Sequence, residues 1–110
     1  MLKKYLLFLF VSVLCYSQRS IGKFERAIRF SVNMKSEIYV IDNAQNKVFK
    51  LDTLGNVLAE NGGYGWGQGS FDNPTDVNCF MLNVIIADKN NHRIEIFDKD
   101  LNFVYEIKYI

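Results

Sequence analysis

The sequence predicts an all-β fold built from two repeated units, each a four-stranded antiparallel sheet. The first observation is a repeat: the stretch 83–98, NVIIADKNNHRIEIFD, matches the stretch 37–52, EIYVIDNAQNKVFKLD, 46 positions earlier. A period of this length indicates repeated supersecondary units. The second observation is that short apolar runs alternate with turn-forming residues, which is typical of strands. The third is that no stretch of about 10 to 15 residues after position 18 shows a helical apolar period, so we expect no long helix.

The N-terminal residues 1–17 have the pattern of a secretory signal peptide. Two lysines precede a twelve-residue, largely apolar stretch, 5–16, and the small residues Cys15 and Ser17 then predict cleavage before Gln18. At ~1.5 Å per residue this stretch spans roughly 18 Å, which is too short to cross a hydrocarbon core of ~30 Å. A cleaved signal is therefore favoured over a membrane anchor. We expect export to the periplasm, the cell surface or the extracellular space, without stable membrane insertion.

The composition of the expected mature chain, 18–110, excludes several classes of protein. Its 93 residues carry 11 basic and 12 acidic side chains, a net charge of −1. This balance argues against a nucleic-acid or anionic-membrane partner. A single cysteine remains, Cys79, so an internal disulfide is excluded and we expect a small buried side chain at that position.

Each repeat is expected to supply four strands. In the first unit, 18–60, the pattern predicts strands at 28–32, 38–41, 47–52 and 57–60. A glycine-rich loop, 61–70, then leads to the second unit, 71–110, with one strand through Cys79 and others at 84–87, 92–97 and 103–110. The last strand alternates, so four side chains are expected on one of its faces: Phe103, Tyr105, Ile107 and Tyr109.

The second repeat resembles an NHL repeat. It carries the stretch 71–77, FDNPTDV, followed by 84–98, VIIADKNNHRIEIFD. In the NHL pattern an aromatic residue and a proline precede a hydrophobic strand ending in Ala-Asp, a turn asparagine, a basic residue, a strand and a closing aspartate. The first repeat is degenerate, with Ala27, Ile41 and Gln45 at the proline, alanine and asparagine positions. The resemblance covers 22–102 and implies blades of a β-propeller, usually six-bladed.

Two blades cannot close a ring, and their outer faces and edges would be left bare. Either the chain is the N-terminal part of a larger propeller, or blades assemble between chains by self-association through their open faces. The sequence favours the first interpretation. In both cases the residues shared by the repeats are expected to be structural.

The glycine-rich loop, NGGYGWGQGS, is the candidate binding segment. It contains neither a GxxxxGK[ST] nor a GxGxxG pattern followed by a helix, which excludes a standard phosphate loop. It connects the two units and carries Tyr64 and Trp66. Either the two rings form part of a ligand surface, as exposed aromatic residues on loops often do, or they pack down over the next unit.

The repeated aspartates are expected to hold turns rather than to do chemistry, because a carboxylate next to a turn can accept backbone N–H bonds. This role is predicted for Asp42, Asp52, Asp88 and Asp98, with Asn91 in the turn after Asp88. The only histidine, His92, is expected in the same turn. Lys47 and Arg93 are expected to form ion pairs at the edges of the units.

Nothing in the sequence indicates a catalytic triad, a metal site or a cofactor. The leading hypothesis is a non-catalytic, extracytoplasmic binding or scaffold module whose partner is a protein or a carbohydrate. The alternative is a fragment of a propeller enzyme, a metal-dependent hydrolase or lyase, whose catalytic residues lie outside this chain. Further repeats bearing channel-facing histidines would distinguish the second hypothesis from the first.

Overall fold

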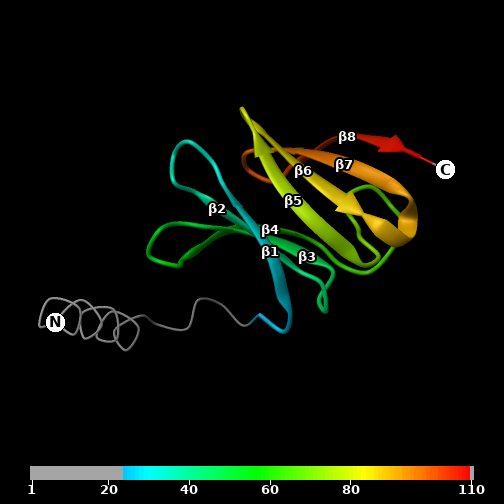
Figure 1. Ribbon diagram of the computed structural model, residues 1–110, viewed down its shortest axis with the longest axis horizontal. Coiled ribbons are helices and arrows are strands. Elements are labelled where there is room, and N and C mark those ends of the chain that lie inside the picture. The colour runs from blue at the N-terminus through cyan, green and yellow to red at the C-terminus, as the bar shows by residue number, and fades with distance from the viewer. Residues whose placement is uncertain (1–23, 110) are drawn as a thin grey trace, which may run out of the picture.

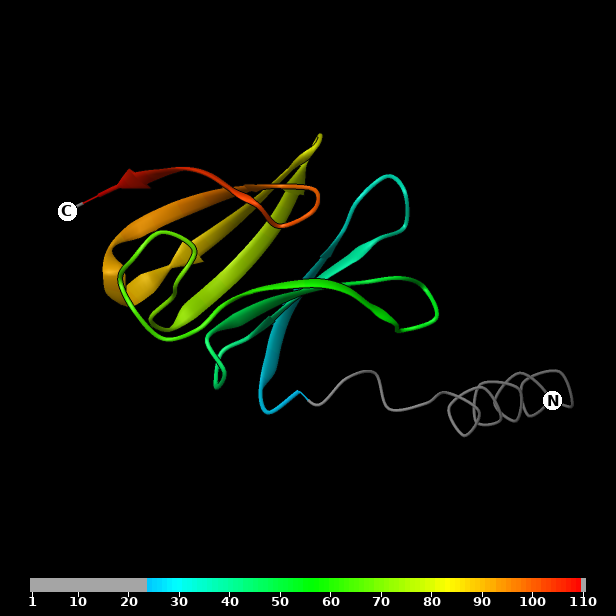
Figure 2. The same ribbon diagram turned by 180° about the vertical axis from the view of Figure 1, so that it is seen from behind.

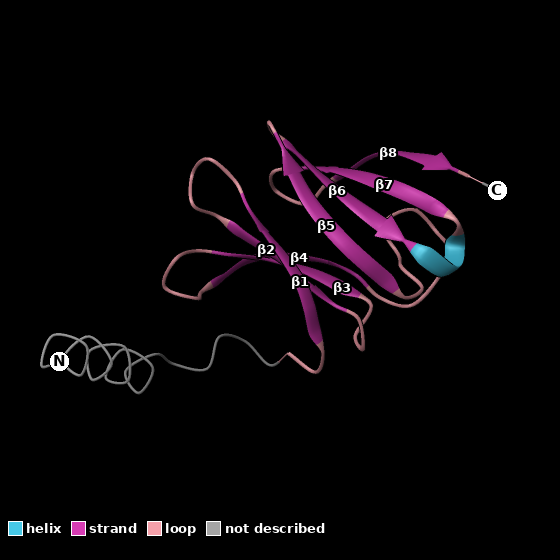
Figure 3. Cartoon of the chain, viewed as in Figure 1, coloured by secondary structure: helices cyan, strands magenta, loops and turns pink. Residues whose placement is uncertain are grey.

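The structure, a computed structural model, describes residues 24–109, and within this range all regular structure is strand except one short 3-10 turn (Figure 3). The all-β prediction is therefore confirmed. The predicted signal peptide, 1–17, lies outside the described residues. The strands are β1 (Ala27–Val32), β2 (Ile38–Asp42), β3 (Lys47–Leu51), β4 (Val57–Gly62), β5 (Pro74–Phe80), β6 (Asn83–Asp88), β7 (Arg93–Asp98) and β8 (Phe103–Lys108), with a 3-10 turn η1 (Lys89–Asn91) before β7.

The strands form two four-stranded antiparallel sheets in simple sequence order, β1 to β4 in sheet 1 and β5 to β8 in sheet 2. Each sheet is made of consecutive hairpins (Figure 1). The register repeats with the sequence: Val40 pairs with Phe49 in sheet 1, and Ile86 pairs with Glu95 in sheet 2. Strand β4 extends to Gly62, two residues beyond the predicted end, because its pairing with β3 continues as far as Lys47.

The two sheets pack face to face, and equivalent faces can be named from the repeat. We call face A the side that carries Val40 in sheet 1 and its equivalent Ile86 in sheet 2. Face B is the opposite side, which carries Tyr39 in sheet 1 and Ile85 in sheet 2. Face B of sheet 1 lies on face A of sheet 2, with β5 beside β1 and β2 (Figure 1).

A single apolar core fills the space between the sheets. Its buried members are Tyr39, Ile41 and Val48 from sheet 1, Val77, Val84, Ile86 and Phe97 from sheet 2, and Phe71 and Leu101 from connecting segments. Each fully buried large apolar side chain contributes about 1.5–3 kcal/mol, against about 1 kcal/mol for a typical hydrogen bond. The shared core is therefore the main force that joins the two sheets.

Hydrogen bonds between the sheets fix how they sit on each other. The Tyr39 hydroxyl donates to the carbonyl of Lys99 at 2.6 Å, and Asn61 Nδ2 donates to the carbonyl of Leu101 at 2.8 Å. Where β2 ends and β5 begins, Asn43 Nδ2 donates to the carbonyl of Pro74 at 2.9 Å. These bonds satisfy polar groups that the packing of the sheets takes out of water.

A β-bulge in β8 corrects the predicted face of that strand. In β8 the register shifts so that Ile96 pairs with Tyr105 but Phe97 pairs with Phe103. Phe103 consequently packs with Phe97 at the core, 6.0 Å between ring centroids, and the expectation that it shares a face with Tyr105 is wrong. A similar shift in β1 lets Ile28 reach the same core. A bulge inserts one unpaired residue, and periodicity alone does not reveal it.

Candidate functional site

The glycine-rich segment leaves sheet 1 at the end of β4 through a tight passage. Gly62 has a φ of +121°, and a Cβ placed on it would lie 2.5 Å from the carbonyl oxygen of Asn46. Only glycine fits this approach without displacing the backbone. The next amide, of Gly63, donates to that same carbonyl at 2.7 Å, which anchors the start of the loop to the β2–β3 turn.

The loop is held from below by Arg93, at the start of β7. Its guanidinium donates to the carbonyls of Trp66 at 2.8 Å, Gly67 at 2.9 Å and Ser70 at 2.8 Å. Asn91 Nδ2 adds a bond of 2.8 Å to the carbonyl of Gly65. Four loop carbonyls are thus captured by two side chains of sheet 2, so the backbone around Trp66 has a defined conformation although four of the eight residues 63–70 are glycine.

Arg93 also binds three carboxylates, and we call this set the Arg93 cluster. Its nitrogens lie 2.9 Å from Asp88 Oδ2, 2.8 Å from Glu95 Oε1 and 2.9 Å from Glu106 Oε2. The Arg93 side chain is almost fully buried. The predicted ion pair therefore exists, but it lies beneath the loop and not at an edge. Nothing in the local sequence indicated this burial, because the covering carbonyls come from residues more than twenty positions away.

Glu95 is the group in the cluster whose charge is least well compensated. It is completely buried, and among the described residues neither carboxylate oxygen has a hydrogen-bond partner of normal geometry. Burial raises the pKa of Glu95 to about 7, and the Arg93 charge and the Gly69 amide offset this only in part. Sheet 1 has Phe49 at the equivalent position, so the repeat gave no signal of a buried acid.

The two predicted ligand-binding rings are exposed on this braced loop. Tyr64 is 71% exposed and Trp66 is 78% exposed. They are therefore not packed down over sheet 2. Seen from behind, the loop lies across the end of sheet 2 at which β7 begins (Figure 2). The site thus combines a fixed backbone with two free aromatic faces.

The structure places the predicted turn aspartates within their turns. Asp52 Oδ1 accepts from the amides of Leu54 at 2.9 Å and Asn56 at 2.8 Å, and Asp98 accepts from Asp100 and Asn102, both at 2.9 Å. The Asn102 amide lowers the pKa of the Asp98 carboxyl, and Asn56 does the same for Asp52.

Asp42 and Asp88 are completely buried, and their hydrogen bonds extend beyond their own turns. Asp42 accepts from Gln45 Nε2 at 2.7 Å, and Asp88 accepts from Asn91 Nδ2 at 2.8 Å. Each also binds the segment that precedes the first strand of its own sheet: the Glu25 amide lies 2.7 Å from Asp42, and the Asp72 amide lies 2.8 Å from Asp88. They therefore tie together parts of the chain about 17 residues apart in sequence.

The remaining candidates have structural surroundings. His92 is exposed and takes the left-handed conformation that ends η1. Lys47 lies 3.1 Å from Glu60, in a partly exposed pair at the position equivalent to Arg93 and Glu106. Cys79 is half-buried against the core, its amide donates to Ser31 Oγ at 3.0 Å, and burial raises the pKa of its thiol.

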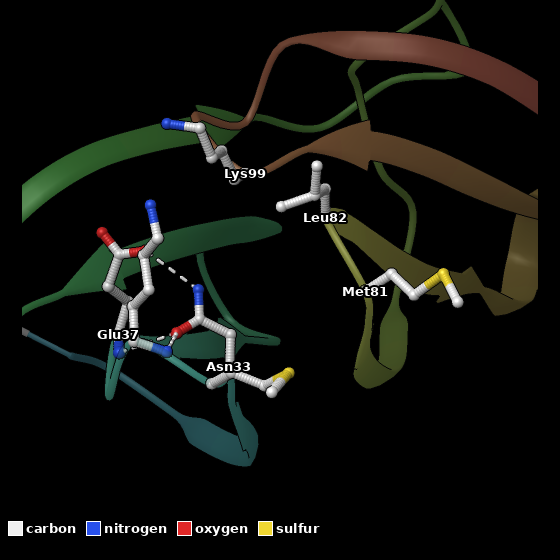
Figure 4. A pocket seen from close by; sticks show the side chains of 7 residues that line it. Asn33, Glu37, Met81, Leu82 and Lys99 are labelled. Atoms are coloured by element: carbon white, nitrogen blue, oxygen red, sulfur yellow. Dashed lines mark hydrogen bonds between the residues drawn. The ribbon is translucent and has the colours of Figure 1, made fainter.

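A second hollow lies at the opposite end of the sheets, between the β1–β2 and β5–β6 turns (Figure 4). It has a volume of about 320 Å³, at the lower end of the range for ligand pockets. Its apolar lining comes from Met34, Met81 and Leu82. Its polar lining comes from Asn33, Lys35, Glu37 and Lys99, and of these Glu37 is already paired with Lys50 at 2.9 Å.

Across the part of the chain that the structure describes, no group of three or more His, Cys, Asp and Glu side chains is arranged to hold a metal ion. In the same residues, no helix has the length and hydrophobicity needed to pass through a membrane.

Comparison with known proteins relates the fold to two solved structures. AztD from Citrobacter koseri, in its apo form, matches with a TM-score of 0.60 and 17% identity over 76% of this chain and 23% of that one. A protein of Bacteroides fragilis NCTC 9343 that is classed as exported matches with a TM-score of 0.64 and 12% identity over 82% of this chain and 26% of its own. The chain thus spans about a quarter of each, and identities this low show likeness of fold alone. No protein-family model and no curated protein matches the chain.

Proposed function

We propose that this protein is an extracytoplasmic, non-catalytic binding module made of propeller-type blades of the NHL kind. Its recognition surface is the loop that carries Tyr64 and Trp66, and its ligand is a carbohydrate or a protein segment that presents a flat apolar face. The leader-like residues 1–17 and the likeness to a protein classed as exported support a place outside the cytoplasm. The agreement of the sheet topology with consecutive four-stranded blades supports the propeller assignment.

One observation carries the proposal: two large aromatic side chains are exposed on a loop whose carbonyls are held by Arg93 and Asn91. A mobile loop would lose conformational entropy on binding, and a braced loop loses less. Exposed Trp and Tyr rings supply much of the contact energy in recognition surfaces. A purely structural loop would gain nothing from holding these rings in solvent.

The test uses Trp66 as its own reporter, because it is the only tryptophan of the chain. We expect its fluorescence to change when the protein is titrated with a ligand from a panel of soluble cello-, chito- and xylo-oligosaccharides, or with a peptide selected from a displayed library. Calorimetry on Tyr64→Ala and Trp66→Ala should then show affinity lowered at least about tenfold.

Leu54→Ala is the matched control, because Leu54 is an equally exposed apolar residue in the β3–β4 turn, and it should bind like the wild type. Equal affinities of the wild type and Trp66→Ala for every ligand found would reject the loop as the recognition surface.

A further inference from the structure

We infer that the two sheet faces left uncovered within residues 24–109 form a head-to-tail interface with a second copy of the same chain. Face A of sheet 1 would receive face B of sheet 2 from the next copy. The inference is independent of the role of Tyr64 and Trp66. It follows from a comparison of residues buried between the two sheets with the equivalent residues on the outer sheet faces, which are exposed.

The intramolecular contact shows which faces fit each other. Val77 and Cys79 of β5 pair with Ile86 and Val84, and they lie under face B of sheet 1. Their equivalents in sheet 1 pair in the same way: Phe30 with Val40, and Val32 with Ile38. Val77 is only 4% exposed, whereas Phe30 is 70% and Val32 50% exposed. On β1, sheet 1 therefore exposes the equivalents of residues that are covered in sheet 2, whereas Val40, Phe49 and Leu51 of the same face are buried in a cluster with Phe24 and Ile38.

Face B of sheet 2 likewise has apolar residues that are less buried than their equivalents in sheet 1. Tyr39, Ile41 and Val48 on face B of sheet 1 are completely buried by sheet 2. Their equivalents on face B of sheet 2 are only half-buried, namely Ile85, Ala87 and Ile94, although Ile96 on the same face is buried. A hollow of about 100 Å³ lies beside them, lined by these three residues together with Asp76, Val77 and Asn78. On β8 of this face Tyr105 and Ile107 are each about half exposed.

Two features beside the contact between the sheets, an aromatic pair and an ion pair, also occur on face A of sheet 1. Phe24 packs edge-on against Phe49 at 5.2 Å between ring centroids, and Phe71 packs against Phe97 with tilted rings at 5.8 Å. In both sheets an aromatic residue before the first strand thus covers a ring of the third strand, although Phe49 is the equivalent of Glu95 and not of Phe97. The Lys47–Glu60 pair repeats the Arg93–Glu106 pair. Face A of sheet 1 is thus preformed as the same kind of docking surface. A face of one kind that meets a face of the other kind gives a heterologous contact, which extends into a ring or a chain of copies.

The experiment blocks each face separately on the protein as exported. Phe30→Glu places a charge on face A of sheet 1, and Ile107→Glu places one on face B of sheet 2. Both positions are at least half exposed, so each variant should fold, and circular dichroism with thermal melting checks this. Sedimentation velocity is then run up to ~100 µM, where micromolar contacts are populated.

We expect the wild type to sediment as a species larger than a dimer, and each variant alone as a monomer. An equimolar mixture of the two variants should form a 1:1 dimer, because one unblocked pair of faces remains. Leu54→Glu, an exposed change off both faces, should assemble like the wild type.

A monomeric wild type would overturn the inference and leave both faces to another occupant. A dimer formed by either variant alone would also overturn it, because face A would then bind face A, or face B would bind face B. A mixture that stays monomeric would exclude the head-to-tail pairing.

Discussion

At the scale of single residues, the two repeats differ most at one position on face A. Sheet 1 has Phe49 there, in contact with Phe24, and sheet 2 has the buried acid Glu95 beside Arg93. An isolated buried carboxylate is costly, and a single arginine shared among three carboxylates and three carbonyls compensates it only in part. The cluster therefore holds the loop in place, but it contains an acid that is only partly ionised at neutral pH and whose charged form is destabilising.

Glu95→Gln tests this directly. The folded-state pKa of about 7 lies above the ordinary value of 4.5 for a glutamate, so the folded protein holds an extra proton between these pH values. Stability should be highest below pH 4.5 as far as this group is concerned, and should fall as pH rises toward 7. Glu95→Gln lacks this loss of stability with rising pH. Its free energy of unfolding, measured with denaturant, should equal that of the wild type near pH 4.5 and exceed it by about 2–3 kcal/mol at pH 8.

Glu60→Gln is the control for this measurement, because Glu60 belongs to an exposed pair, and its profile should follow the wild type. A wild-type profile that is flat between pH 5 and 7 would contradict the assigned charge state of Glu95.

At the scale of elements, the β7–β8 turn within sheet 2 and the glycine-rich loop that leads into sheet 2 are held in different ways. The β7–β8 turn is self-contained, because Asp98 accepts the amides of its own turn. The glycine-rich loop makes three backbone hydrogen bonds within 63–71, and Arg93 and Asn91 bind four more of its carbonyls from sheet 2. Its order therefore depends on the packing of the loop against sheet 2 as well as on the loop sequence.

Arg93→Lys should release the loop. A lysine cannot reproduce the planar guanidinium that reaches three carbonyls and three carboxylates at once. We expect stability to fall by about 3 kcal/mol, because buried carboxylates lose part of their compensation. Hydrogen exchange of the amides in 63–70 should accelerate more than that of β2 and β3.

Lys47→Ala changes the equivalent position in sheet 1, where the pair is exposed and no loop is bound, and should cost less than about 1 kcal/mol. Unchanged exchange in the loop of Arg93→Lys would show that other contacts hold it.

At the scale of the whole molecule, the two sheets share one core, so neither is expected to unfold alone. Ile41 lies on β2 and is completely buried against sheet 2. Ile41→Ala removes its side chain from this shared core and should cost about 2–5 kcal/mol. Native-state hydrogen exchange should show protection lost in β2, β3, β5 and β6 together.

Ile107→Ala provides the comparison, because Ile107 lies half exposed on the free face of sheet 2, and its effect should be small at dilutions where copies do not associate. Loss of protection confined to sheet 1 in Ile41→Ala would mean that the sheets unfold as separate units.

The sequence by itself determined the all-β class, the two four-stranded units and the positions of most turns. The 46-residue repeat and the local alternation are encoded within short windows, and Asp52 and Asp98 bond to amides two and four residues away. Such features depend on nearby residues only. The exposure of Tyr64 and Trp66 was left open by the sequence, because packing of a loop depends on what lies beneath it.

Tertiary structure alone decided the rest. The bulge at Phe103, the burial of Arg93 and Glu95, and the pairing of face B of sheet 1 with face A of sheet 2 all arise from contacts between segments far apart in the chain. A repeat pattern marks equivalent positions, but it does not say which copy of a face is covered. That is settled only when one sheet excludes water from the other, and it is why equivalent residues such as Val77 and Phe30 have opposite exposure.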